Sequence, residues 1–384
     1  IYLCVGRKNE ASLCREFITL VSQALDIYVP EEISTFKSLF RYIMEAATRQ
    51  SFNLVIDEFQ EFYNINKSIY SDIQDIWDQY RQKTHMNFVV SGSIYSLMEK
   101  IFHNEKEPLF GRADNIIKLS AFSLNVLKKI MKDYHPQYTN DDLLALYSFS
   151  GGVPKYVELF CDNRVLTVDE MIDFMVRDNS PFTDEGKNLL IEEFGKNYGT
   201  YFSILSAISG GYNTQTEIEA LLGEKSLGGY LKRLIEDYNI VVRQRPVFSK
   251  EGSQTVRYEI CDNFIHFWFN YFDRNRSLIE IKNFVGLRKL IKADYPTYSG
   301  KILEQYFKQK YEFRLIGSWW EPKGNQNEID IVAIYLDNKS AIVAKVKRQK
   351  KNFKPELFQK KVEHLENKVL AKYQINTVCL SLED

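Results

Sequence analysis

The stretch NLVIDEFQEF, from Asn53 to Phe62, ends a run of apolar residues on two adjacent carboxylates, Asp57 and Glu58. The run is short and rich in branched side chains, which indicates a buried strand. In parallel sheets, ligands bind at the carboxyl ends of the strands. The pair is therefore a candidate for holding a metal ion or orienting water, although a strand that simply ends in solvent would also end on polar residues.

The sequence around this strand alternates between strand and helix patterns. IYLCV begins the chain, and two amphipathic helix patterns follow between 10 and 50, the second with Ser34 as a candidate N-cap. After the central strand come a helix pattern over 71–84 and the apolar run MNFVVSGS over 86–93. This order predicts a parallel sheet with helices on both faces.

Polar residues follow the next strand as well. Ser91 or Ser93 would lie beside Asp57 on the neighbouring strand tip. Further on, PLFGRAD places Arg112 on a turn, and a guanidinium suits the stabilisation of phosphoryl charge. A salt bridge at the surface is the simpler explanation for any single arginine.

Four motifs together resemble the archaeal-type ATPases, a P-loop family close to the AAA+ and STAND NTPases. LVIDEFQEF resembles their Walker B motif, FVVSGSIYSLMEKIF their sensor strand and helix, EPLFGRADNIIKLSAFS the segment after it, and GGVPKYVELF the glycine-x-proline module of the lid. They occur in the family's order over residues 53–160. The resemblance implies ATP and Mg²⁺ as cofactors, with Asp57 at the metal, Glu58 at the attacking water, and Ser91 and Arg112 at the phosphates.

One required motif is absent from the 384 residues. A P-loop needs G-x-x-x-x-G-K-[ST], whose backbone N–H groups and lysine hold the phosphates, and the nearest segment, VGRKNEAS, lacks that spacing. In the resembling family this loop precedes a strand like IYLCV. We therefore expect that the natural N-terminus is missing, which explains the retained site residues better than natural loss of the loop does. Binding of ATP and Mg²⁺ would both depend on that loop.

The pattern predicts an α/β multidomain chain in four parts. A P-loop ATPase core occupies 1–120 and a helical lid 121–185. Three short helices and a pair of strands over 186–275 are typical of a winged helix-turn-helix. The last part, 276–384, has the order α-β-β-β-α-β and resembles the restriction-endonuclease fold.

Basic residues decorate the predicted winged helix. Lys225, Lys232 and Arg233 lie off the apolar face of its last helix. The strand pair adds Arg243, Arg245, Lys250 and Arg257. Such a distribution could contact phosphates of DNA, but many winged helices contact only protein, so both partners stay open. The aromatic run NFIHFWFNYF is expected in a core between domains.

The last part contains residues in the order of a nuclease site, namely Glu304, Asp330 and Lys347. A nuclease of the resembling type has Glu-x-Lys on its last catalytic strand, whereas this chain has Lys345-x-Lys347. We expect the Lys345 ammonium to occupy the cation's place and pair with Asp330, which leaves the site without a metal ion. The basic run KRQKKNFK is either a solvated face or a phosphate-contacting patch.

Composition limits the remaining choices. With 50 Lys and Arg against 51 Asp and Glu, no overall field draws the chain to nucleic acid or membrane. Five scattered cysteines indicate a cytoplasmic protein, and no segment is suited to span a membrane. We predict an ATP-dependent switch or motor that acts on nucleic acid, with ATPase activity in the intact protein. The alternative is a non-catalytic DNA- or protein-binding module, and an active Mg²⁺ nuclease is disfavoured by Lys345.

Overall fold

A computed structural model describes the chain except residues 251, 253–254, 311–312, 322–326 and 337–338. The chain forms two compact units, Ile1–Lys118 and Leu119–Asp384. The finer division into four parts remains a prediction.

The first unit is built on a parallel sheet of three strands in the order β1-β2-β3. Its elements are β1 (Tyr2–Cys4), α1 (Glu10–Leu25), α2 (Phe36–Ala46), β2 (Asn53–Asp57), the 3-10 turn η1 (Phe59–Glu61), α3 (Phe62–Ile65), α4 (Ser68–Tyr80), β3 (Asn87–Val90) and α5 (Tyr95–His103). Helices connect the strands because parallel neighbours require long crossovers. The predicted parallel sheet is confirmed. The second helix is capped by Thr35 and not by Ser34.

The two faces of this sheet differ in cover. Leu3, Leu54 and Ile56 are buried in one core with the apolar faces of α1, α2 and α4. On the opposite face, Tyr2 and Val89 are 58% and 42% exposed. The expectation of helices on both faces is therefore not met by the described residues of this unit.

The second unit begins with helices and continues into a hairpin of strands. The helices are α6 (Leu124–Tyr134), α7 (Asn140–Ser150), α8 (Pro154–Asp162), α9 (Val168–Met175), α10 (Glu185–Phe194), α11 (Tyr198–Ser209), α12 (Gln215–Leu222) and α13 (Gly228–Glu236), with a 3-10 turn η2 (Gly195–Asn197). Antiparallel strands β4 (Val241–Gln244) and β5 (Arg257–Ile260) follow. Next come α14 (Asn263–Phe267), the π-helix η3 (Trp268–Asp273), α15 (Arg276–Glu280) and α16 (Phe284–Lys310). The pattern YSGKILEQYFKQKY predicts a helix over 298–311, and this helix is the second half of α16; the last residue of the pattern lies outside the described residues.

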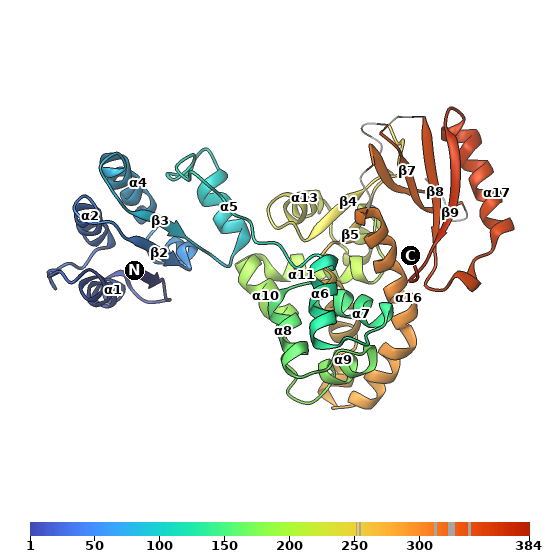
Figure 1. The fold of residues 1–384 in the computed structure, drawn as a ribbon, viewed down its shortest axis with the longest axis horizontal. Coiled ribbons are helices and arrows are strands. Elements are labelled where there is room, and N and C mark those ends of the chain that lie inside the picture. The colour runs from blue at the N-terminus through green and yellow to red at the C-terminus, as the bar shows by residue number, and fades with distance from the viewer. Residues whose placement is uncertain (251, 253–254, 311–312, 322–326, 337–338) are drawn as a thin grey trace. The chain divides into compact units, whose positions relative to one another are not determined.

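A mixed sheet of four strands, in the order β6-β7-β8-β9, completes the chain (Figure 1). Its elements are β6 (Leu315–Trp319), β7 (Ile329–Ile334), β8 (Ser340–Val346), the turn η4 (Lys350–Asn352), α17 (Pro355–Leu365), the π-helix η5 (Glu366–Leu370) and β9 (Gln374–Leu380). The first two pairings are antiparallel, and β8 with β9 is parallel. One apolar core runs from Leu127 to Val346 and includes the aromatic run over 263–272, as expected.

Candidate functional site

The acid pair lies at the carboxyl end of β2, where the backbone turns sharply. Asp57 is the last residue of the strand. Glu58 follows in the left-handed region, with φ 52° and ψ 37°. That conformation costs a non-glycine residue about 1–2 kcal/mol, so the surrounding contacts must hold it. The turn separates the two carboxylates, although they are adjacent in sequence.

Asp57 is held by hydrogen bonds from both neighbouring strands. The Ser91 hydroxyl, just beyond β3, donates to Oδ1 over 2.6 Å, and the Tyr2 hydroxyl on β1 donates to Oδ2. These two bonds hold the pKa of the Asp57 carboxyl below its ordinary value. The hydrogen bond between Tyr2 and Asp57 also raises the pKa of the Tyr2 hydroxyl to about 12. The carboxylate is therefore ionised at neutral pH and offers the hard oxygen ligand that Mg²⁺ takes.

Glu58 is held by a different set of donors. Its Oε2 accepts hydrogen bonds from the Ser93 hydroxyl over 2.9 Å and from the Gln60 side-chain amide. Gln60 is fully buried, and within the described part of the chain its Oε1 has no hydrogen-bond partner. A Cβ at Gly92 would lie 2.2 Å from that oxygen, so a larger residue there would require the Gln60 and Met98 side chains to move. Sequence reasoning selected Ser91 and Ser93 but missed Gln60, because burial of a polar residue in NLVIDEFQEF leaves no periodic signal.

Arg112 is engaged elsewhere. Its Nη2 lies 2.9 Å from Asp78 Oδ2 in α4, its Nε contacts both carboxylate oxygens, and Nη1 donates to the Phe110 carbonyl. This is the salt bridge that the sequence offered as the simpler explanation. Its role at a phosphate remains a prediction without a supporting contact.

In the second unit, Asp330 on β7 and Lys345 on β8 form the expected ion pair. The ammonium lies 2.5 Å from Asp330 Oδ1, and the carboxylate is only 4% exposed. The backbone N–H of Val346 donates to Oδ2 over 2.8 Å. Both oxygens of Asp330 are thus engaged by donors of the chain itself.

Glu304 belongs to the same neighbourhood. Burial, and after it the Asp330 charge, raise its pKa to about 7 against the opposing effects of Lys308 and Lys345. Lys347 lies beyond the end of β8, where its backbone N–H donates to the Leu380 carbonyl over 2.9 Å. The structure therefore brings Glu304, Asp330 and Lys345 together, and no described contact joins Lys347 to them.

The hairpin of β4 and β5 is fixed against the C-terminal sheet. The Val247 N–H donates to the Ser318 carbonyl over 3.0 Å, and the Val247 side chain is 6% exposed. Arg257 pairs with Glu328 over 3.0 Å and stacks on Trp320. The Arg257 guanidinium, predicted to contact phosphates, is therefore engaged by side chains of the chain itself.

Two of the remaining basic side chains have partners on their own helix or beside it. Lys232 lies 3.6 Å from Glu236 on α13, and the Arg233 guanidinium covers the Tyr230 ring. Lys225, Arg243, Arg245 and Lys250 are exposed.

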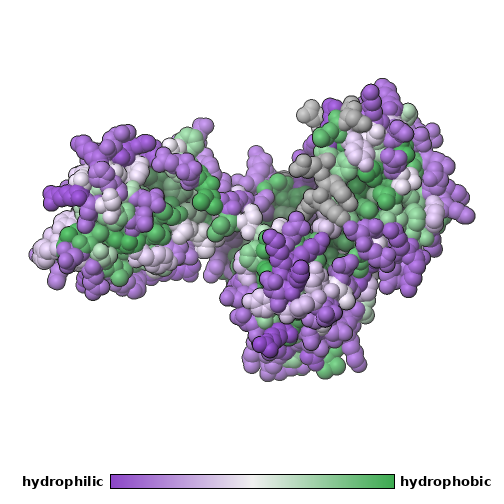
Figure 2. Space-filling view, in the orientation of Figure 1, coloured by the Kyte–Doolittle hydropathy of each residue, from purple (hydrophilic) through white to green (hydrophobic). Residues whose placement is uncertain are grey.

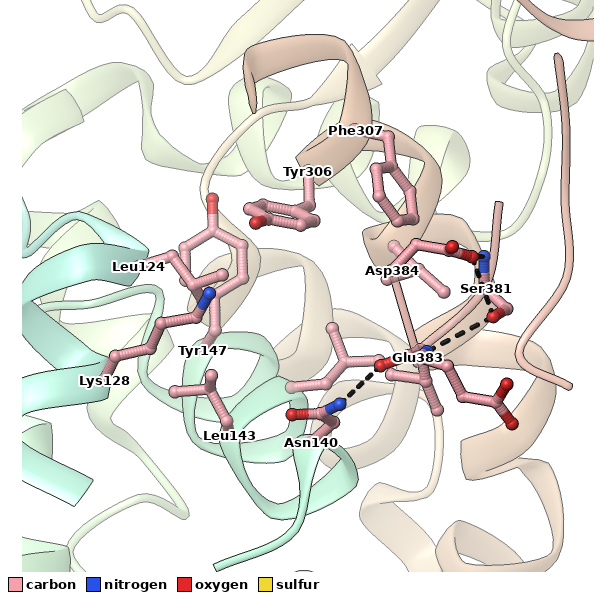
Figure 3. A pocket seen from close by; sticks show the side chains of 13 residues that line it. Leu124, Lys128, Asn140, Leu143, Tyr147, Tyr306, Phe307, Ser381, Glu383 and Asp384 are labelled. Atoms are coloured by element: carbon pink, nitrogen blue, oxygen red, sulfur yellow. Dashed lines mark hydrogen bonds between the residues drawn. The ribbon is translucent and has the colours of Figure 1, made fainter. Parts of the chain in front are cut away.

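A pocket of about 270 Å³ lies among α6, α7, α16 and residues 381–384 (Figure 3). The Asn140 side-chain amide donates to the Leu382 carbonyl over 2.6 Å, and Ser381 donates to Asp384. These bonds fix the last residues against α7. The pocket belongs to the second unit, whereas Asp57 and Glu58 belong to the first.

Over the part of the chain that the structure describes, no group of three His, Cys, Asp or Glu side chains is arranged to hold a metal ion. A nucleotide-bound Mg²⁺ needs only one or two carboxylates besides phosphate and water, so Asp57 fits that type of site. In the same described residues, no helix has the length and apolarity to cross a membrane.

Comparison with known proteins gives two family matches. Residues 8–160 match an ATPase domain found predominantly in archaea, and residues 268–357 match a family of archaeal and bacterial proteins of unknown function. An uncharacterized protein of Methanocaldococcus jannaschii is 30% identical over 314 residues, which cover 77% of this chain and 67% of that protein. Among solved structures, a Walker-type ATPase of Pyrococcus abyssi matches with a TM-score of 0.50 at 16% identity, covering 70% of this chain and 83% of the other.

Proposed function

The chain belongs to the archaeal-type P-loop ATPases, and we propose that its acid pair serves the hydrolysis of ATP. Asp57 would hold the nucleotide's Mg²⁺, and Glu58 would orient the attacking water. The observation that supports this most directly is the separate fixation of the two carboxylates, Asp57 by Ser91 and Tyr2, and Glu58 by Ser93 and Gln60.

The hydrogen bonds suit different roles for the two acids. Asp57 is ionised, and its Oδ1 already accepts from the Ser91 hydroxyl and from the Glu58 backbone N–H. Its Oδ2 accepts from Tyr2 alone among the described contacts, so Oδ2 keeps a lone pair for a cation. Glu58 is held through Oε2 alone in the contacts described, which leaves Oε1 to accept a proton or a hydrogen bond from water. Bound Mg²⁺ would neutralise phosphate charge. Ser91 is placed to couple the metal carboxylate to the neighbouring strand.

The 384 residues contain no G-x-x-x-x-G-K-[ST], the phosphate-binding loop of P-loop NTPases. The chain by itself should bind Mg-ATP weakly, because the loop supplies most of the anion-binding N–H groups. Isothermal titration tests this, and a micromolar dissociation constant would contradict it.

The catalytic proposal is tested in a protein that carries a phosphate loop ahead of Ile1. Glu58→Gln should bind ATP with unchanged affinity and lose turnover, because the amide cannot act as a base. Asp57→Asn should weaken Mg-ATP binding itself. Glu32→Gln, at an exposed glutamate before α2, is the matched control and should behave as wild type. Normal turnover in Glu58→Gln would remove Glu58 from the reaction.

We further propose that α13 and the hairpin contact nucleic acid. The protein would then be an ATP-dependent switch or motor of the AAA+ type that acts on nucleic acid in the cytoplasm. The three short helices and the hairpin fit a winged helix, and Lys225, Arg243, Arg245 and Lys250 are exposed. The counter-evidence is specific, since Arg257 is paired with Glu328. A protein partner at this surface, without catalysis, is therefore the second candidate.

Salt dependence separates these partners. Phosphate contacts release counterions, so DNA affinity should fall steeply with salt. Alanine at Lys225, Arg243, Arg245 and Lys250 should weaken binding and flatten that dependence. The control set removes the same charge from exposed sites elsewhere: Lys83, Lys106, Lys129 and Lys132. Binding that ignores salt, or that both sets weaken equally, would favour the protein contact.

For the C-terminal sheet and its helices we propose a nuclease-like domain without metal. Its support is the strand order and the ion pair between Asp330 and Lys345, which occupies the oxygens that a divalent ion would need. The unit positive charge at this position repels a divalent ion 4 Å away by about 8 kcal/mol at an effective dielectric near 20.

A further inference from the structure

Strand β9 lies at the edge of the C-terminal sheet, with β8 as its neighbour on one side. The seven residues Gln374–Leu380 carry no charge, and Gln374, Asn376, Thr377 and Val378 are exposed. Among the described residues, no strand pairs with the other side of β9. Long uncharged edge strands are templates for pairing with another chain, and monomeric proteins usually protect them with charge, proline or a bulge.

The hydrogen bonds to β8 determine which residues face the open edge. The Gln374 N–H donates to the Lys339 carbonyl over 2.8 Å, and the Lys347 N–H donates to the Leu380 carbonyl over 2.9 Å. Residues alternate along a strand, so 374, 376, 378 and 380 bond toward β8. The N–H and C=O groups of Ile375, Thr377 and Cys379 therefore point outward.

We propose that a second copy of this chain pairs antiparallel along β9, about a two-fold axis at Thr377. In this register Thr377 faces its own copy, and Ile375 faces Cys379 of that copy. All three residue pairs then consist of outward-facing groups, and each exchanges two hydrogen bonds, as an antiparallel ladder requires. The two sheets of four strands become one continuous sheet.

Charge favours the antiparallel direction. Lys372 precedes β9 and Glu383 follows it, and both side chains are exposed. An antiparallel partner places the basic end of one strand beside the acidic end of the other. A parallel partner would place like charges together. The edge is thus complementary to itself, which is the condition for a two-fold interface.

Apolar surface beside the edge adds to the pairing. A groove of about 370 Å³ lies on the sheet face that carries Asn376, Val378 and Leu380, and Tyr335 and Val378 are 38% and 36% exposed there. Figure 2 shows apolar side chains gathered over this sheet. Directly opposed residues of an antiparallel pair share a face, so the two-fold axis sets Asn376 against Val378 of the second copy. Part of the exposed apolar surface is covered as a result.

Light scattering of the chain over a concentration series is the primary test. Wild type should have twice the 45.1 kDa mass of one chain. Thr377→Pro should be monomeric and folded, since the lost N–H does not serve the ladder with β8. Thr377→Lys should also be monomeric, because it sets two charges against each other on the axis. A wild-type monomer, or a dimer that persists in both variants, would overturn the proposal.

Cross-linking tests the register independently of any folding defect in the proline variant. With Cys379→Ser as background, Thr377→Cys should form a disulfide-linked dimer under mild oxidation, because paired Cα atoms lie about 5.5 Å apart. Asn376→Cys is the control, since its counterpart lies two residues away along the ladder. Equal cross-linking at 376 and 377, or none at 377, would exclude the register.

Discussion

Replacing Lys345 by Met should destabilise the second unit by about 3 kcal/mol. The substitution keeps the aliphatic stem and leaves the Asp330 carboxylate, which is 4% exposed, without its cation. Two unit charges separated by the observed 2.5 Å attract by about 7 kcal/mol at an effective dielectric near 20. Desolvation offsets much of that, and removing one partner of a buried pair costs about 3–5 kcal/mol. The 24% exposure of the Lys345 side chain places the expected loss at the lower end.

Calorimetric unfolding measures this loss as a fall in Tm of about 6–12 °C, from about 2–4 °C per kcal/mol for a domain of this size. The double variant Asp330→Asn/Lys345→Met should recover most of the stability, because it removes the orphaned charge and keeps an acceptor for the Val346 N–H. The reasoning is refuted if Lys345→Met has the same Tm as wild type. It is also refuted if the double variant is no more stable than the single one.

Three further outcomes are expected. The pKa of Glu304 is raised from 4.5 to about 7, mainly by burial, so its contribution to stability is complete below about pH 4.5 and is lost as pH rises through 7. The free energy of unfolding of Glu304→Gln, measured in urea at pH 8, should therefore exceed that of wild type by up to about 3 kcal/mol. No gain in stability at pH 8 would contradict this. Plasmid nicking with Mg²⁺ or Mn²⁺ should be absent in wild type and appear, if at all, only in Lys345→Glu; metal-dependent cleavage by wild type would reverse this assignment. Gly152→Ala should cost about 1–3 kcal/mol, since φ is +76° and the new Cβ would lie 2.4 Å from the Phe122 carbonyl. Gly229→Ala, in open space on α13, should instead gain about 0.5–1 kcal/mol, and equal effects would count against the steric argument.

Helix α16 shows where sequence reasoning about the fold succeeds and where it stops. The pattern YSGKILEQYFKQKY predicts a helix that begins at residue 298. The structure extends it from Phe284 through Pro296. Buried residues recur at Leu287, Ile291, Tyr295 and Tyr298 across that position. The 3.6-residue period therefore continues through Pro296, and burial along the whole face extends the helix beyond the short pattern that predicts it.

The candidate site divides in a similar way. Motif order placed Asp57, Glu58 and Ser91 together, because strand tips of a parallel sheet meet at one edge. The order of motifs does not predict the partner of Arg112, because its salt bridge with Asp78 depends on how α4 packs. Gln60 is hidden for the same reason, as its burial follows from the turn at Glu58 and the close approach of Gly92. Spacing along the chain predicts which residues share an edge, whereas three-dimensional packing decides which partners they find.

The contact between the hairpin tip and the C-terminal sheet has an evolutionary consequence. The Val247 N–H bonds to the Ser318 carbonyl, and the Phe248 ring packs tilted against the Tyr373 ring with centroids 6.0 Å apart, so two segments far apart in the gene complete one core. Recombination that joined this hairpin to a foreign C-terminal segment would leave Trp319 uncovered. The two segments should thus be inherited together, and among relatives substitutions at 247 and 248 should be matched by changes at 318–320 and 373.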